Sequence, residues 1–355
     1  MAFEELGYYN FPEKLKEKND LNSPETGRVI AEHKERYIVR SAKGEFEAEI
    51  SGNMRFAAKN REDFPAVGDW VSLTNYESGI AIIHEIFPRF SLIKRQAVGK
   101  PGEIQIIAAN IDYAFIIQSI DRDFNINRLE RYLTICNSSK IRPIIVLTKI
   151  DLIDETRLAE LIGKIKTRER DVPLLAISNE THDGFEAIIK SIEKGKTYCL
   201  LGSSGVGKST LLNNLAGRDL MRTESISQTI NRGKHVTSHR QLIILDNGGI
   251  LIDNPGMREV GIADATGGLE ATFERIVALA QNCRFSNCTH ISEKGCSVLE
   301  AVEQEEIDKS SYENFLKMER EKAYYEETLA ERRKKEKDFG KFVKNYKKEM
   351  KRKKE

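Results

Sequence analysis

The residues best suited to do chemistry form a glycine-rich run, Gly-Ser-Ser-Gly-Val-Gly-Lys-Ser-Thr, at positions 202–210. The run follows an apolar stretch at 198–201 and precedes leucines at helical spacing, which predicts a strand, a loop and a helix. Glycines let backbone N–H groups converge on a phosphate, and the positive end of the following helix points to the same place. The G-x-x-x-x-G-K-S pattern in this setting argues against an ordinary glycine turn. It predicts a nucleoside triphosphate site.

Residue types within this run suggest separate roles. Lys208 can reach the β- and γ-phosphates, and the hydroxyl of Ser209 can ligate Mg²⁺. We expect phosphate or ion contacts from the whole run: Gly202, Ser203, Ser204, Gly205, Val206, Gly207, Lys208, Ser209 and Thr210.

A second group of residues indicates which base is bound. The apolar run 141–147 ends in Thr148, Lys149, Ile150 and Asp151. A carboxylate at 151 can accept both the N1–H and the N2–H₂ of guanine, whereas adenine would present a lone pair to it. Lys149 can lay its stem along the base, and Thr148 stands beside it. Alternatively, Asp151 simply caps a helix. After a further strand at 173–177 comes Ser178-Asn179, whose backbone is expected to contact the guanine O6.

Candidate switch residues follow the phosphate loop in the chain. Asp253 ends a strand and begins Asp-Asn-Pro-Gly, so it can hold Mg²⁺ through water while the N–H of Gly256 reaches the γ-phosphate. A plain Asn-Pro-Gly turn would also explain this glycine. In the polar segment 225–240, the hydroxyl of Thr237 can complete the Mg²⁺ shell.

Catalysis needs a group that orients the attacking water. Met257 occupies the position where many GTPases carry a glutamine, and a thioether cannot do this. We therefore expect slow intrinsic hydrolysis and hypothesise that His235 positions the water.

The order of these elements is informative. The base-reading residues at 148–151 and 178 precede the phosphate loop at 202–209, which precedes the switch residues at 237 and 253–256. An ordinary GTPase begins with the phosphate loop, so this order predicts the same sheet with its termini moved to another connection.

Hydrophobic patterns place these residues on an α/β frame. Apolar runs alternate with helical segments, which predicts strands at 113–118, 141–147 and 173–177 and helices at 127–137 and 155–169. Two last strands, 242–245 and 250–253, flank Asp-Asn-Gly-Gly and predict a hairpin, hence one antiparallel strand. Residues 90–107 have the composition of a linker.

An earlier part of the chain predicts a second fold. Five short strands, at 27–31, 36–40, 46–50, 69–73 and 80–86, suggest a small barrel of oligonucleotide/oligosaccharide-binding (OB) type. The long connection 51–67 carries several cations around Phe56, so it is either a nucleic-acid contact or a solvated loop.

A metal site is predicted near the end of the chain. Cys283, Cys288, His290 and Cys296 form C-x₄-C-x-H-x₅-C within a polar stretch. Three thiolates and one imidazole make a closed tetrahedral set that suits structural Zn²⁺ and leaves no open position for catalysis. Helical spacing at 297–304 and 312–329 predicts helices packed around this loop. Cys136 and Cys199 lie in apolar segments and are expected to be inert core residues.

Bulk composition narrows the class of protein. A chain of 355 residues with 40% hydrophobic and 31% charged residues is expected to form two or three soluble domains, and its longest apolar runs are far too short for a membrane span. The polar first residues predict no signal peptide, so we expect a cytoplasmic protein. We also expect it to be a monomer. The net charge is only +1, yet residues 331–355 carry thirteen Lys or Arg against five acidic residues. This basic tail, with its interspersed aromatics, suits RNA, although charge runs are often only solvated.

Taken together, the motifs and their order resemble the small-subunit-dependent ribosomal GTPases of the RsgA/YjeQ family. The resemblance implies an N-terminal arm at 1–26, an OB barrel at 27–95, a circularly permuted α/β P-loop GTPase domain at 96–264, a zinc-binding, mainly helical domain at 265–330 and a basic tail at 331–355. It further implies GTP and GDP, Mg²⁺ and one structural Zn²⁺ as ligands, with the small ribosomal subunit and its rRNA as partners. The implied activity is subunit-stimulated GTP hydrolysis in late small-subunit assembly, with release coupled to hydrolysis.

Departures from the family pattern exist. Thr148 replaces the commoner Asn, and the two switch runs read Gly-Lys-His-Val-Thr-Ser and Asp-Asn-Pro-Gly rather than Gly-Arg-His-Thr-Thr-Thr and Asp-Thr-Pro-Gly. One function of another class stays open: an RNA-binding assembly scaffold in which the nucleotide is only structural. The barrel and the Cys₃His set disfavour a permuted GTPase that acts on large subunits.

Overall fold

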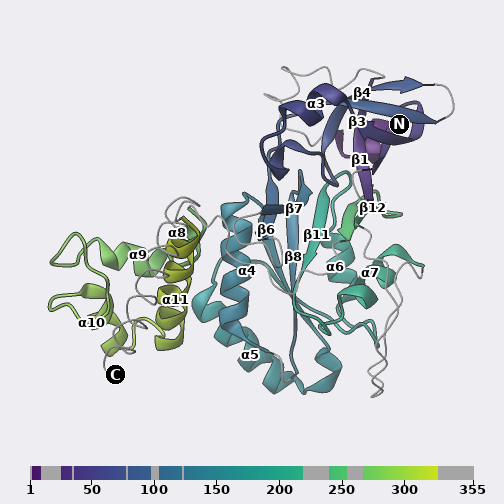
Figure 1. Cartoon of the computed structure of the whole chain (residues 1–355). Helices are drawn as coiled ribbons and strands as arrows, with labels where there is room; N and C mark the ends of the chain where they lie inside the picture. Colours follow the sequence, from purple (N-terminus) through teal and green to yellow (C-terminus); the bar gives the residue numbers. More distant parts are fainter. Residues whose placement is uncertain are drawn as a thin grey trace, which may run out of the picture.

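The computed structural model describes residues 2–8, 25–33, 36–76, 79–96, 104–121, 124–218, 240–253 and 267–326. These residues form a β-barrel, a central α/β domain and a C-terminal group of helices. Figure 1 shows the barrel and the C-terminal helices on different sides of the central domain.

The barrel has five strands in the described chain: β1 (Thr26–His33), β2 (Arg36–Ser41), β3 (Gly44–Ile50), β4 (Trp70–Tyr76) and β5 (Ile80–Ile86). Because β1 pairs with both β2 and β4, the sheet closes on itself, and only the β3–β5 pair is parallel. Ala48 and Ile50 point into its core, as their alternation with glutamates predicted. The predicted OB-type barrel is confirmed. The connection after β3 carries α3 (Gly52–Ala57) and a 3₁₀ turn (Arg61–Asp63).

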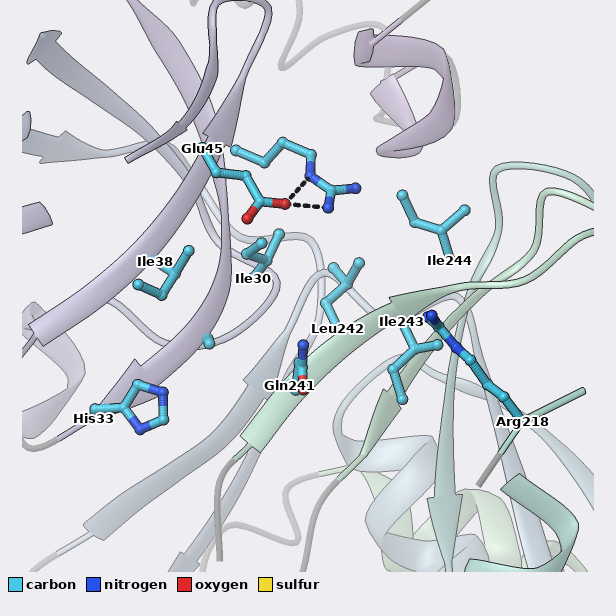
Figure 2. Close-up of a pocket in the computed structure, with 11 residues that line it drawn as sticks. Ile30, His33, Ile38, Glu45, Arg218, Gln241, Leu242, Ile243 and Ile244 are labelled. Atoms are coloured by element: carbon cyan, nitrogen blue, oxygen red, sulfur yellow. Dashed lines mark hydrogen bonds and ion pairs between the residues drawn. The ribbon is translucent and has the colours of Figure 1, made fainter. Parts of the chain in front are cut away.

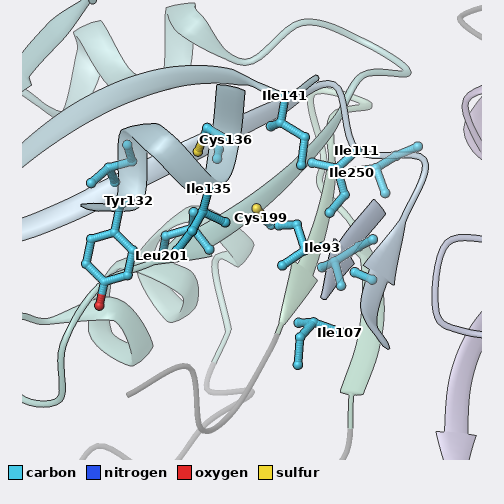
Figure 3. Packing of buried hydrophobic residues seen from close by; sticks show 14 of the residues in the cluster. Ile93, Ile107, Ile111, Tyr132, Ile135, Cys136, Ile141, Cys199, Leu201 and Ile250 are labelled. Atoms are coloured by element: carbon cyan, nitrogen blue, oxygen red, sulfur yellow. The ribbon is translucent and has the colours of Figure 1, made fainter. Parts of the chain in front are cut away.

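The linker predicted at 90–107 is wrong. This segment contains β6 (Leu92–Gln96) and β7 (Ile104–Ala109), which pair as an antiparallel hairpin. Ile93 is fully buried and Ile107 nearly so, and both pack in the core of the central domain (Figure 3). Apolar residues on both arms drive the pairing. The glycines and proline that suggested a linker lie at 99–102, outside the described residues.

The start of the chain, which we expected to be a polar arm, is anchored where it is described. Residues 2–5 form α1 (Ala2–Glu5), and Leu6 is fully buried. The guanidinium of Arg28, on β1, donates to the carbonyl oxygen of Leu6 at 2.6 Å and to Thr197 Oγ1 at 3.0 Å. Burial lowers the pKa of Arg28 to about 10. One buried cation therefore ties together the first helix, the barrel and the central domain.

The central domain is built on strands β8 (Tyr113–Ser119), β9 (Arg142–Thr148), β10 (Leu174–Ala176), β11 (Thr197–Leu201), β12 (Arg240–Ile244) and β13 (Ile250–Asp253). Their spatial order is β10-β9-β8-β11-β13-β12. All neighbours are parallel except β12 and β13, which form the predicted hairpin. The doubly wound sheet with one antiparallel strand is thus confirmed.

Helices cover both faces of this sheet: α4 (Ile126–Ser138) and α5 (Glu155–Arg168) on one face, α6 (Phe185–Ser191) and α7 (Lys208–Ala216) on the other (Figure 1). Alternate residues of β11 serve the two layers: Cys199 and Leu201 pack with α4 (Figure 3), whereas Tyr198 and Leu200 pack with α6 and α7. Burial raises the pKa of the thiols of Cys136 and Cys199. Both thiols are buried in the core, as expected.

The C-terminal unit consists of α8 (Gly268–Thr272), α9 (Glu274–Ala280), α10 (Ser297–Glu303) and α11 (Lys309–Glu326) around its own apolar core. The helix predicted at 312–329 begins earlier, and Asp308 accepts a hydrogen bond from Ser311 N at 2.9 Å in its first turn. The sequence analysis did not predict α8 and α9. No helix among the described residues has the length and apolar character needed to cross a lipid bilayer.

The barrel and the central sheet join edge to edge. β1 pairs antiparallel with β12, Ala31 opposite Gln241, so the two sheets are continuous. A cavity of about 560 Å³ lies at this seam, where Ile30 and Ile38 of the barrel line it together with Leu242 of β12 (Figure 2).

Candidate nucleotide and metal sites

The phosphate loop has the backbone shape that its glycines allow. Gly202, Gly205 and Gly207 have φ angles of 153°, 80° and 88°. A Cβ on Gly202 would lie 2.4 Å from the carbonyl oxygen of Ile117, so only glycine fits there. The ammonium of Lys208 donates to the carbonyl oxygen of Gly202 at 2.8 Å and to that of Ser203. The cation therefore lies over the loop itself, next to the first turn of α7.

The predicted base-reading residues meet beside this loop. Ser178 Oγ donates to Asp151 Oδ1 at 2.5 Å, which holds the carboxylate in place. The hydroxyl of Thr148 is buried and donates to the carbonyl oxygen of Val206 at 2.8 Å, so the base-reading and phosphate-binding segments are directly connected. Lys149 has φ 65°, and its ammonium contacts Asp121 at 2.7 Å.

The alternative that Asp151 caps a helix is wrong. Asp151 lies inside a short 3₁₀ turn (Ile150–Leu152), whereas Asp154 caps α5 by accepting from Arg157 N at 2.8 Å. The carboxylate of Asp151 is thus not used for helix capping, and its second oxygen has no partner among the described residues.

The candidate site lies along the carboxyl ends of the parallel strands. Thr148, Ser178, Gly202 and Asp253 stand at or just beyond the carboxyl ends of β9, β10, β11 and β13, which are parallel. This is the end of the strands where ligands bind in open α/β sheets. His235, Thr237 and Gly256 lie outside the described residues, so their predicted roles stay predictions.

The sequence analysis missed Arg128 and Asp121 at this site, and it considered only the backbone of Asn179. Arg128, in the first turn of α4, donates to Ser203 Oγ at 2.8 Å. Asp121 anchors Lys149, and the side-chain amide of Asn179 contacts the phosphate loop at Gly207. Of these, only Asp121 could have been identified from the sequence, because it is an acidic residue just after the end of a strand.

The four predicted metal ligands converge. Their ligand atoms all lie within 4.8 Å of one another. The sulfurs of Cys283 and Cys296 are 3.8 Å apart, and the Nδ1 of His290 is 3.6 Å and 3.3 Å from them. A tetrahedral Zn²⁺ with Zn–S bonds of about 2.3 Å separates two sulfurs by about 3.8 Å, so the cluster has the dimensions of a metal site.

The loop that presents these ligands is held from within. Glu293 accepts hydrogen bonds from the backbone nitrogens of Thr289, Ile291 and Ser292 at 2.8–3.0 Å. Hydrogen bonds from Thr289, through its hydroxyl and its backbone, together with that from Ser292, lower the pKa of Glu293, which stays ionised. The loop is therefore tied together independently of the ligand atoms.

A polar network joins the central domain to the metal-site unit. The buried carboxylate of Glu130, on α4, accepts from Ser311 Oγ and Asn314 Nδ2, both at 2.6 Å, and from Arg168 at 3.3 Å. Burial raises the pKa of Glu130. Burial and the charge of Glu130 also raise the pKa of nearby Glu169, to about 8. At the contact between α4 and α11, the buried charge of Glu130 is therefore held by hydrogen bonds and raises the pKa of the neighbouring carboxyl group.

The phosphate loop follows β11, the residues suited to guanine come from strands earlier in the chain, and the candidate switch strand comes later. This order of elements defines the class of protein. The protein is a circularly permuted P-loop GTPase with an OB-type barrel and a Cys₃His unit. A family model described as RsgA GTPase matches residues 86–263. The chain belongs to this family.

Relatives support the assignment over nearly the full length. The chain is 42% identical to the small ribosomal subunit biogenesis GTPase RsgA 2 of Listeria monocytogenes serotype 4b, covering 92% of this chain and 90% of the relative. It is 38% identical to RsgA 1 of Bacteroides thetaiotaomicron, covering 97% of each. The crystal structure of YjeQ from Thermotoga maritima matches with a TM-score of 0.63 and 27% identity, covering 84% of this chain and 98% of that one. YloQ, a circularly permuted GTPase, matches with a TM-score of 0.61 and 25% identity, covering 86% and 96%.

Proposed function

We propose that this GTPase acts in late assembly of the small ribosomal subunit, in the cytoplasm and as a monomer. It binds the subunit and its rRNA, the subunit stimulates its GTP hydrolysis, and hydrolysis releases it. The observation that carries this proposal is the near-full-length similarity to proteins named small ribosomal subunit biogenesis GTPases.

Guanine recognition is assigned to the segments that meet beside the phosphate loop. Asp151, held by Ser178, accepts from the N1 and N2 groups of guanine, and Lys149 lies along the base, while the backbone at Ser178 reaches O6. Thr148 joins this side of the pocket to the loop through Val206. The contacts of Ser178 with Asp151 and of Thr148 with the phosphate loop support the assignment.

Phosphate binding and hydrolysis are assigned to the loop and the switch residues. The loop residues 202–210 bind the phosphates, and Ser209 and Thr237 ligate Mg²⁺, with Asp253 acting through water. Mg²⁺ supplies charge neutralisation at the phosphates. Lys208 stabilises the charge that develops in the transition state, Gly256 reaches the γ-phosphate, and His235 orients the attacking water. Full subunit-stimulated turnover in a His235→Ala variant would overturn the last assignment.

The metal cluster is assigned to one structural Zn²⁺, held by Cys283, Cys288, His290 and Cys296. The distances support it, and four protein ligands leave no position for a substrate. The metal ion would stabilise the folded loop between α9 and α10, which lies in the C-terminal unit that packs beside the GTPase domain.

The barrel is assigned an rRNA contact at α3. Of this helix, Met54 packs partly against the barrel core, whereas the side chain of Phe56 is 94% exposed and is not part of the core. Arg55 precedes it and Lys59 follows it, whereas Arg61, further along, pairs with Glu32 at 2.8 Å. Exposed aromatics among cations stack on unpaired bases, which favours nucleic-acid contact over a merely solvated loop. Phe56→Ala is expected to weaken subunit binding more than Tyr76→Ala, a control on the same barrel that removes another exposed aromatic.

GTP turnover measured with small subunits, large subunits and neither tests the proposed function. We expect marked stimulation by small subunits alone. An RNA-binding scaffold would show no stimulation, and a large-subunit factor would respond to the other particle.

A further inference from the structure

The side chain of Asn179 bridges the two halves of the nucleotide pocket. It follows Ser178, which holds Asp151, and its Nδ2 donates to the carbonyl oxygen of Gly207 at 3.2 Å. The backbone carbonyl oxygen of Asn179 accepts a hydrogen bond from Asn214 Nδ2, on α7, at 3.1 Å. Asn179 is therefore held from both sides, between the base-reading carboxylate and the end of the phosphate loop.

The orientation of this amide follows from its partner. A carbonyl oxygen only accepts, so the nitrogen of the Asn179 amide must face Gly207. That contact takes one of the two N–H bonds on Nδ2, and the described residues provide no partner for the other. The Oδ1 atom is buried and also has no partner in the described part of the chain. The orphaned Oδ1 requires a donor and so says nothing about an acceptor on the base, whereas the remaining N–H on Nδ2 can reach an acceptor on a bound ligand.

Thr148 cannot supply a donor to the base. Its hydroxyl has a single hydrogen, and that hydrogen is used on Val206 O at 2.8 Å in a fully buried position. Val206 and Gly207 are consecutive, so Thr148 and Asn179 reach neighbouring carbonyls of the same loop. Of these two side chains, only the amide keeps a hydrogen to offer.

We propose that Asn179 is a specificity-determining residue for the guanine base and donates its second N–H to N7. The proposal rests on the assignment of Asp151 to the N1–N2 edge. A guanine nucleotide with its base at Asp151 and its phosphates on the loop 202–210 must extend from one to the other. The Asn179 side chain also reaches from the segment beside Asp151 to this loop, so it lies next to the nucleotide. Beyond N1, guanine presents O6 and then N7 along its adjoining major-groove edge, and both atoms only accept, so they match an amide N–H. Asp151 rejects adenine, and Asn179 strengthens the binding of guanine.

The test uses GDP and 7-deaza-GDP, in which a C–H replaces N7. The dissociation constants of both nucleotides are measured for the wild type, Asn179→Ala, Asn179→Leu and Asn214→Ala. The wild type should bind 7-deaza-GDP about 5-fold more weakly than GDP, the effect of one hydrogen bond. Both Asn179 variants should bind the two nucleotides equally. Leu keeps the volume of the side chain, so it separates the loss of the donor from the loss of packing.

Asn214→Ala is the matched control, because it removes a neighbouring carboxamide that contacts Asn179 only through the backbone oxygen. It should keep the 5-fold preference for GDP even where both affinities fall. A preference that persists in both Asn179 variants, or is absent from the wild type, overturns the proposal and leaves the GTPase assignment intact. If Asp151→Asn binds GDP normally, the pocket assignment itself fails, and this proposal fails with it.

Discussion

Replacing Asp151 by Asn should exchange the base that the pocket prefers. Ser178 Oγ donates to Asp151 Oδ1 at 2.5 Å, so in the variant the amide oxygen takes this position and the NH₂ group faces the base. Guanine presents N–H donors there, which would face another donor. Xanthine carries an oxygen at position 2 and would accept from the new amide.

The size of the effect follows from the bonds lost. Each hydrogen bond to a charged group contributes about 1.5–3 kcal/mol, and the carboxylate accepts two from guanine. The expected loss is about 3–6 kcal/mol, which is roughly a 10²- to 10⁴-fold rise in the dissociation constant for GDP. The affinity for xanthosine diphosphate should rise in the same variant.

Titration calorimetry with both nucleotides measures this exchange. Asp154→Asn is the control, because it makes the same substitution three residues further on, at the cap of α5, where Asn serves as well as Asp. Its nucleotide affinities should match those of the wild type. If Asp151→Asn bound GDP as tightly as the wild type, the carboxylate would not touch the base and the reasoning would be refuted.

Three further outcomes are expected. Lys208→Ala should lower GTP turnover at least about 100-fold, because the loop loses its cation, and unchanged turnover would contradict this role. Cys288→Ser should reduce bound zinc, measured by atomic absorption, and lower the melting temperature, whereas Ser286→Ala in the same loop should change neither; full zinc content in Cys288→Ser would contradict the assignment. The pKa of Glu169 is raised to about 8 by burial and by Glu130, so its ionisation destabilises the fold increasingly from about pH 4.5 to 8. The full shift corresponds to about 5 kcal/mol, which partial solvent access reduces, so Glu169→Gln should stabilise by about 1–2 kcal/mol at pH 9 and by almost nothing at pH 4.5. An equal gain at both pH values, measured by urea unfolding, would rule out this explanation.

Short-range patterns in the sequence identified much of this protein. The phosphate loop, the Cys₃His set and the permuted order were visible because their chemistry depends on residues close together in the chain, at spacings that few other structures require. The alternation around Ala48 likewise placed a barrel strand, because a strand with one buried face has a period of two.

Contacts between distant segments were decided only by the folded chain. The sequence left Asp151 open as a helix cap, whereas in the folded chain Asp154 caps α5 and the carboxylate of Asp151 meets Ser178, 27 residues away. The same holds for Arg128, which reaches Ser203 across 75 residues, and for β6 and β7, whose composition resembled a linker. Such pairings depend on which strands become neighbours in the sheet, and local residue patterns carry little information about that choice.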